Sequence, residues 1–306
     1  MKTKERTATQ YRNPSSGSHL SPPASEEGDS TRTSSLESRT KIESEQRAIR
    51  VDDSTCLSAQ IRFDPSQTCR GTVVFVHGFC GDKRENGLFD SISDRCARDG
   101  FLTLAYDWRG LGESDGDFPS ARMEDHMGDF VSLIHWVKEN YPDQSRSTFA
   151  LGFSLGAAVI GLAIRELREA IHGISYLSPA VRPKVSMWPR YDRAEHWASI
   201  RSKGFFPKGE KQVPIGETIM GYLRDTDLGL NAFHLPVPLL ICHGEEDSKI
   251  DIRHTKEIYQ TCRSSRGDLE FRAIPRASHS FRPENEYWPQ ISSLVSQWFL
   301  DRAKHA

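Results

Sequence analysis

Continuous apolar runs alternate along this chain with segments in which apolar residues recur every three or four positions. The runs predict strands buried on both faces of a parallel sheet, at 71–76, 101–106, 149–151, 171–177 and 237–242. Helical spacing predicts the intervening helices at 86–98, 123–141, 157–164, 251–262 and 288–303. Residues 57–63 alternate as in a half-exposed strand, and 269–274 predict a last strand. This order predicts an α/β fold with a mostly parallel sheet and helices on both faces.

The first 46 residues are rich in Ser, Thr, Glu, Arg and Pro and nearly lack aliphatic side chains. Such a segment cannot bury enough apolar surface to offset the entropy lost on ordering. We therefore predict a disordered N-terminal tail over 1–46 and a folded domain over 47–306. A cleaved organelle presequence is the weaker interpretation, because Pro14, Pro22 and Pro23 would interrupt an amphipathic helix.

Residues 181–235 break the alternation of strands and helices. Connections beyond ~15 residues are usually functional or disordered, and this one is too aromatic for disorder. We therefore predict a small lid inserted over the carboxyl edge of the sheet, where ligands bind in open α/β folds. An additional packing layer is the alternative.

Charge and cysteine content narrow the class of protein. The net charge of -2 and the pI near 6.6 give no electrostatic reason to expect a nucleic-acid or membrane-surface partner. The six cysteines form neither a C-x-x-C motif nor a paired metal spacing, so we expect buried free thiols, no metal and no cofactor. No apolar run approaches the ~18 residues of a membrane span, and the N-terminus lacks the apolar region of a signal peptide. A soluble cytoplasmic protein is expected.

The candidate chemistry centres on Gly152-Phe153-Ser154-Leu155-Gly156, which joins an apolar run to a helix-forming segment. Small residues two positions before and after a serine allow a strand-to-helix turn that is too tight for side chains. Such a turn presents the serine hydroxyl beside a helix N-terminus, which favours developing negative charge. A glycine-bounded turn with no catalytic role has the same pattern. Residues elsewhere in the chain must therefore show whether Ser154 is a nucleophile.

Two further segments supply the partners that a nucleophilic serine needs. A base must take the proton of the hydroxyl, and a buried carboxylate must orient that base. Asp247 follows the predicted strand at 237–242, and His279 lies a few residues beyond the strand at 269–274. Ser154, Asp247 and His279 thus occur in the chain order nucleophile, acid, base, each at the carboxyl edge of the sheet. This agreement predicts a Ser-His-Asp hydrolase.

Other residues compete for these roles. Turn length favours Asp247 as the acid over its neighbours Glu245, Glu246 and Asp251, and Asp251 is expected to cap the following helix. Three other histidines could act as the base, and each is expected to have a structural role instead. His77 and His243 each precede a glycine after a predicted strand and would pack turns. His254 lies inside a predicted helix and would be at the surface.

The tetrahedral intermediate needs two donors for its oxyanion. The backbone N–H of Leu155, at the start of the elbow helix, is one candidate, and the N–H of Phe79, in the loop after the first buried strand, is the other. Each such donor is typically worth ~3 kcal/mol of transition-state stabilisation.

Three segments of the chain resemble the motifs of a known family. They are His77-Gly78-Phe79-Cys80-Gly81-Asp82-Lys83, Tyr106-Asp107-Trp108-Arg109-Gly110-Leu111-Gly112-Glu113-Ser114-Asp115-Gly116 and the elbow. From about residue 50 to the C-terminus the chain resembles the small α/β-hydrolase esterases of the cinnamoyl and feruloyl esterase type, within a broader set that includes S33-like aminopeptidases and dienelactone-hydrolase-like proteins. The resemblance implies Ser154, Asp247 and His279 as a triad, with Phe79 and Leu155 as the oxyanion hole. It also implies that a lid shapes the acyl pocket.

The leading hypothesis is a cofactor-free carboxylic ester hydrolase that forms an acyl-enzyme on a small to medium ester. The aromatic residues of the predicted lid favour an aromatic or acyl substrate. A thioesterase or acyltransferase would use the same triad and is the second hypothesis. A non-catalytic receptor or scaffold on the same fold is the third, and an intact triad argues against it.

Overall fold

The computed structural model describes residues 41–303, and its central feature is an eight-stranded sheet in the order β1-β2-β4-β3-β5-β6-β9-β10. β2 is antiparallel to β1 and to β4, and all other neighbours are parallel. The predicted mostly parallel sheet is therefore confirmed. The strands are β1 (Glu43–Arg50), β2 (Cys56–Phe63), β3 (Gly71–Val76), β4 (Phe101–Tyr106), β5 (Thr148–Phe153), β6 (Gly173–Leu177), β9 (Leu239–Gly244) and β10 (Leu269–Ile274).

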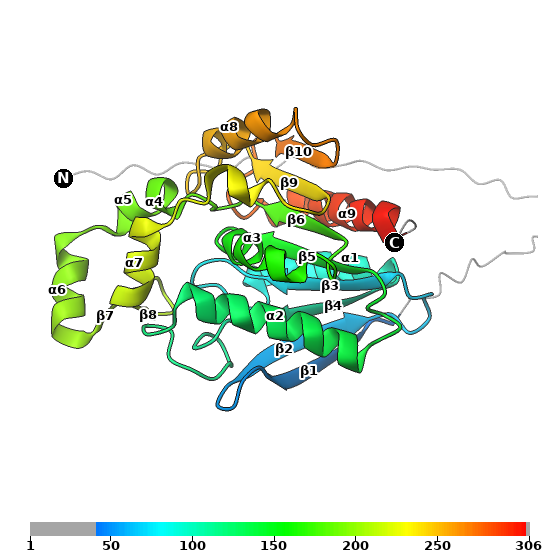
Figure 1. Cartoon of the computed structure of the whole chain (residues 1–306), viewed down its shortest axis with the longest axis horizontal. Helices are drawn as coiled ribbons and strands as arrows, with labels where there is room; N and C mark the ends of the chain where they lie inside the picture. The colour runs from blue at the N-terminus through cyan, green and yellow to red at the C-terminus, as the bar shows by residue number, and fades with distance from the viewer. Residues whose placement is uncertain (1–40, 304–306) are drawn as a thin grey trace, which may run out of the picture. The chain divides into compact units, whose positions relative to one another are not determined.

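Helices cover both faces of this sheet, as the sequence predicts (Figure 1). One face carries α1 (Leu88–Arg98) and α9 (Glu284–Ala303), packed on side chains such as Phe75 and Phe149. The other carries α2 (Met123–Asn140), α3 (Gly156–Leu167) and α8 (Ile252–Cys262). All residues of β3, β4, β5, β6 and β9 are buried, because they lie between these two helical layers.

The predicted boundary of the N-terminal tail at residue 46 differs from the structure. β1 begins at Glu43 and pairs along its whole length with β2, from Glu43 opposite Phe63 to Arg50 opposite Cys56. β1 is an edge strand whose side chains are mostly solvent-exposed, so its polar composition resembles that of a tail. The rest of the predicted tail, residues 1–40, lies outside the described residues.

The segment 181–235 forms its own substructure between β6 and β9, at one end of the sheet (Figure 1). It consists of short helices around a two-stranded antiparallel hairpin. Its elements are α4 (Pro183–Ser186), α5 (Trp188–Tyr191), α6 (Ala194–Lys203), β7 (Phe205–Lys208), β8 (Val213–Gly216), α7 (Glu217–Asp225) and the 3-10 helix η2 (Gly229–Ala232).

All six cysteines lie within the described residues and are free thiols; Cys96, Cys242 and Cys262 are buried and Cys69 is exposed. Within residues 41–303, no cluster of three or more His, Cys, Asp or Glu side chains is arranged to hold a metal ion. No helix in that range is long and apolar enough to cross a membrane.

Candidate active site

Ser154 occupies a strained turn between β5 and α3. Its φ of 52° lies in the left-handed region, which non-glycine residues rarely adopt, and it directs the side chain out of the strand. The flanking glycines are required by close approach: a Cβ on Gly156 would lie 2.1 Å from the carbonyl oxygen of Val76, and one on Gly152 would lie 2.8 Å from the backbone of Ala157. The pentapeptide therefore forms the strand–turn–helix elbow that its spacing predicts.

The structure brings the three residues singled out in the sequence into one hydrogen-bonded chain. Nε2 of His279 lies 3.1 Å from Oγ of Ser154, and Nδ1 of His279 lies 2.7 Å from Oδ2 of Asp247. Asp247 follows β9 and His279 follows β10, and these strands are parallel neighbours whose carboxyl ends share one edge. All three side chains are at least nine-tenths buried as residues, so water competes little for these bonds.

The environment sets the charge of both partners of the serine. Burial alone would raise the pKa of Asp247, but hydrogen bonds from His243 and His279 outweigh it and hold this pKa well below its ordinary value. Burial lowers the pKa of His279, while Asp247 opposes that shift. At neutral pH the acid is thus ionised and the imidazole is neutral, which are the states that general-base catalysis needs.

His243 contributes to the site in a way that the sequence analysis missed. It was expected to pack a turn, yet its Nε2 lies 3.0 Å from Oδ2 of Asp247, and its Nδ1 lies 3.0 Å from Oγ1 of Thr255. The ring is fully buried. Since Nε2 also lies 3.0 Å from the carbonyl oxygen of Ile250, both of its neighbours are acceptors and Nε2 carries the proton. The signal in the sequence was a histidine four residues before the acid.

Within the described part of the chain, the other residues considered as acid or base are not hydrogen-bonded to Ser154, His279 or Asp247 through their side chains. His77 spans a turn, with Nδ1 2.8 Å from the Gly78 carbonyl oxygen and Nε2 accepting the Trp108 N–H at 2.9 Å. This agrees with the turn-packing role expected for it. Asp251 caps α8 by accepting the N–H of Arg253 at 2.9 Å, as expected. Glu245 and Glu246 are exposed, and His254 is half-buried in α8; these three lie outside the chain of hydrogen bonds around Ser154.

The loop that follows β3 carries Phe79 and lies against the elbow. A Cβ on Gly78 would lie 3.1 Å from Cβ of Ser154, so this backbone runs directly beside the nucleophile. Oε1 of Glu85 accepts the Gly78 N–H at 2.6 Å, and burial raises the pKa of Glu85 to about 7. Within residues 41–303, neither the N–H of Phe79 nor that of Leu155 donates to another backbone group outside the regular helices and strands.

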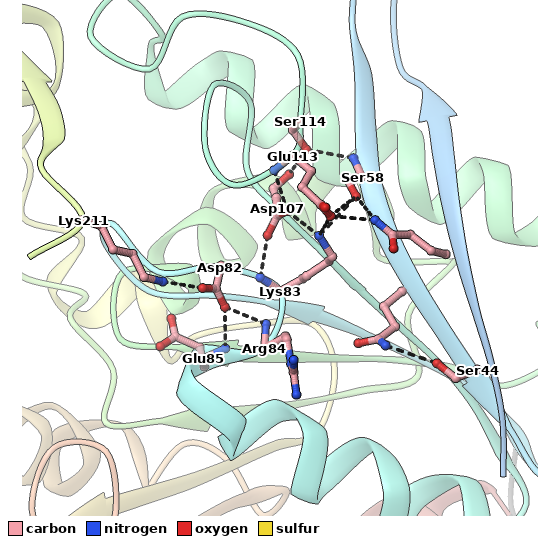
Figure 2. Close-up of polar contacts among 12 residues, drawn as sticks. Ser44, Ser58, Asp82, Lys83, Arg84, Glu85, Asp107, Glu113, Ser114 and Lys211 are labelled. Carbon is pink, nitrogen blue, oxygen red and sulfur yellow. Dashed lines mark hydrogen bonds and ion pairs between the residues drawn. The ribbon is translucent and has the colours of Figure 1, made fainter.

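Ion pairs anchor this loop to neighbouring segments of the chain (Figure 2). The Lys83 ammonium lies 2.6 Å from Oδ2 of Asp107 and 2.6 Å from Oε2 of Glu113, and the Lys83 N–H donates to Oδ1 of Asp107 at 2.7 Å. Asp82 pairs with Lys211, which belongs to the turn between β7 and β8. The loop is thus tied both to the segment after β4 and to the insertion at 181–235.

A cavity of about 490 Å³ opens above Ser154 and His279. Its floor is formed by the elbow and the loop after β3, and its other wall is formed by the insertion. The apolar side chains of that wall include Met187, Tyr191 and Val213. Phe79 contacts Tyr191 edge-on with ring centroids 5.5 Å apart, so an aromatic pair joins the loop after β3 to the insertion.

Comparisons with known proteins agree with this architecture. The family described as serine aminopeptidase, S33, matches residues 67–211. An uncharacterized 31.7 kDa protein in the traX-finO intergenic region of Escherichia coli is 32% identical over 266 residues, which cover 74% of this chain and 89% of that protein. The AB hydrolase superfamily protein YisY of Bacillus subtilis is 24% identical over 258 residues, covering 74% and 90%.

Among solved structures, Est1E from Butyrivibrio proteoclasticus with ferulic acid bound has a similar fold. The TM-score is 0.69 at 18% identity, over 83% of this chain and 99% of Est1E. At this identity the likeness concerns the fold alone.

Proposed function

This chain belongs to the α/β-hydrolase family, and from that premise we propose that it is a serine carboxylic ester hydrolase that forms an acyl-enzyme on Ser154. The observation that carries the proposal is the continuous hydrogen-bonded chain from Oγ of Ser154 through His279 to Asp247. A scaffold or receptor would gain nothing from burying an ionised carboxylate behind a neutral histidine that faces a strained serine.

The proposed reaction begins when Oγ of Ser154 attacks the carbonyl carbon of the ester while Nε2 of His279 takes the hydroxyl proton. The imidazolium that forms is stabilised by Asp247. The tetrahedral intermediate then collapses, the C–O bond to the alcohol breaks, and His279 returns the proton to the leaving oxygen. Water, activated by His279 in the same way, attacks the acyl-enzyme and releases the acid.

The oxyanion of the tetrahedral intermediate would be held by the N–H groups of Leu155 and Phe79. Leu155 precedes α3, so its N–H lies at the positive end of that helix. Phe79 lines the cavity together with Ser154. Because both donors belong to the main chain, side-chain substitutions at these positions would test them poorly.

We further propose that residues 181–235 act as a lid and that the acyl part of the substrate lies beneath it. The apolar wall of the cavity fits an acyl chain or an aromatic ring of moderate size. Est1E, with its similar fold, was solved with the aromatic acid ferulic acid bound, which supports an aromatic acyl group as one candidate.

Pre-steady-state hydrolysis of 4-nitrophenyl esters of graded chain length tests the proposal. We expect a burst of 4-nitrophenol equal to the enzyme concentration, followed by slower turnover, and loss of the burst in Ser154→Ala. Ser202→Ala, an exposed serine on α6, is the matched control and should retain the burst. The chain length of maximal activity would give the depth of the cavity.

Equal rates in wild type and Ser154→Ala would refute the serine mechanism. A burst that is followed by no turnover in water would indicate an acyltransferase if turnover begins when an alcohol or thiol is added. Faster turnover of a thioester than of the matching ester would instead favour a thioesterase.

A further inference from the structure

Four lysine and arginine side chains line the cavity above Ser154. Lys208 comes from β7, Arg190 from α5, Lys249 from the loop after β9 and Lys211 from the turn between β7 and β8. Of these, Lys211 already has a carboxylate partner in Asp82, as Figure 2 shows. The other three converge on the cavity from separate elements.

Within residues 41–303 no carboxylate forms an ion pair with Lys208, Lys249 or Arg190. Nη2 of Arg190 donates to two backbone carbonyls, those of Ser186 and Lys249. The Lys208 ammonium lies 5.2 Å from the centroid of the Phe79 ring. Cations that outnumber the carboxylates beside a reactive centre favour the binding of an anion there.

Two carboxylates share the lining but do not neutralise it. Glu85 is buried and accepts the Gly78 N–H, and its pKa of about 7 leaves it partly protonated at neutral pH. Glu210 is exposed on the turn between β7 and β8. The three cations that form no ion pair within residues 41–303 therefore exceed the negative charge that the cavity itself supplies.

Lys249 and Lys208 reach the same cavity from different elements, the loop after β9 and the β7–β8 hairpin. Lys249 is two residues from Asp247, and its backbone N–H donates to Oδ1 of that acid at 2.8 Å. Burial is the main reason that the pKa of His279 is lowered, and the Lys249 ammonium adds to that shift, which places this charge near the base. Lys208 extends over Phe79 from the hairpin.

We propose that this cavity selects esters whose acyl part carries a second, ionised carboxylate, and that Lys208 and Lys249 bind that carboxylate. The inference rests on the proposed ester hydrolysis and names its substrate class. A charge-assisted hydrogen bond in a partly enclosed cavity is about twice as strong as a neutral one, whereas a neutral acyl end would leave both ammonium groups without a partner.

Two esters of equal chain length test the selectivity. The 4-nitrophenyl monoester of adipic acid is anionic, and 4-nitrophenyl hexanoate is its neutral counterpart; rates without enzyme are subtracted for each. At pH 8 and low salt we expect kcat/KM to favour the adipate monoester by about tenfold, which corresponds to one charge-assisted contact. The preference should shrink on addition of salt, since salt screens partly exposed charges.

Substitutions locate the effect. Lys249→Gln and Lys208→Gln should each reduce the ratio of adipate to hexanoate kcat/KM about threefold or more, and the double variant should bring that ratio to about one. The ratio is the readout, because it cancels any change in hexanoate hydrolysis that follows from loss of the Lys249 charge near His279. Lys184→Gln is the matched control, because Lys184 is an exposed lysine of the insertion outside the cavity, and it should leave the ratio unchanged.

Hydrolysis of the hexanoate ester at the rate of the adipate monoester or faster would overturn the charge selectivity and leave the esterase proposal standing. An adipate preference that survives in the double variant would overturn the assignment to these lysines. Absence of turnover with both esters would refute the proposed function and this inference together.

Discussion

Asp247→Asn is the sharpest test of the site, because the structure dictates how the new amide must orient. Oδ1 of Asp247 accepts two backbone N–H groups, those of Lys249 and Ile250, each at 2.8 Å. Only an oxygen can occupy that position. The amide nitrogen of the variant must therefore replace Oδ2, where it faces Nδ1 of His279 and Nε2 of His243.

This orientation reverses the tautomer of His279, the proposed base. An amide N–H that donates to Nδ1 of His279 leaves the proton of the imidazole on Nε2, which points at Oγ of Ser154 from 3.1 Å. A protonated Nε2 cannot accept the serine proton. The equivalent change in other triads lowers kcat by ~10⁴, or about 5 kcal/mol of transition-state free energy, and we expect a similar loss here.

The assay is steady-state hydrolysis of 4-nitrophenyl hexanoate, with thermal unfolding to verify that each variant is folded. Asp251→Asn is the matched control, because Asp251 caps α8 and lies outside the triad. Asn is also a good cap, so kcat should remain within about twofold. A kcat for Asp247→Asn within tenfold of wild type would refute the assignment of the acid, as would a loss of 10³ or more in Asp251→Asn.

Three further predictions concern the surroundings of the triad. His243→Phe deletes one donor to the acid and should lower kcat about tenfold with little change in KM, whereas Thr255→Val, which removes the other partner of that ring, should change kcat less; steady-state kinetics on both would decide. Lys83→Met leaves the buried carboxylate of Asp107 without its cation and should lower the free energy of unfolding by ~3 kcal/mol. Urea denaturation measures this loss. An unchanged midpoint would contradict a stabilising role for the Lys83–Asp107 ion pair. Burial lowers the pKa of His279, so its imidazole stays neutral at pH values below the ordinary histidine pKa of ~6.5. We therefore expect kcat/KM to persist below pH ~6.5 and to fall as the pH drops through the lowered pKa. A fall in kcat/KM that is already centred at or above pH ~6.5 would contradict this prediction.

The arrangement of Ser154, His279 and Asp247 could be predicted from the sequence because it follows from a local turn motif and from the ends of parallel strands. The elbow is a local turn whose glycines are required by backbone contacts within the same βα unit and with β3. Asp247 and His279 each follow a strand, and parallel strands end at a common edge, so their meeting with Ser154 follows from chain order.

Where a residue's role depends on which groups face it in the folded chain, the sequence was less informative. β1 was missed at its start because an edge strand with exposed faces has no apolar pattern, and only its pairing with β2 defines it. The bond from His243 to Asp247 was missed because a histidine at the end of a strand is compatible with many roles until its neighbours are known.

The same distinction separates what the enzyme does from what it acts on. Ser154, His279 and Asp247 lie at or just beyond strand ends, so their mutual geometry is a property of the sheet. The cations above them come from β7, α5 and the loop after β9, and the insertion supplies Lys208 and Arg190. Substitutions within 181–235 can therefore alter the charge of the cavity without moving the triad. Substrate preference should change readily between members of this family while the chemistry stays constant, and this is why charge-matched ester pairs are more informative than a general esterase assay.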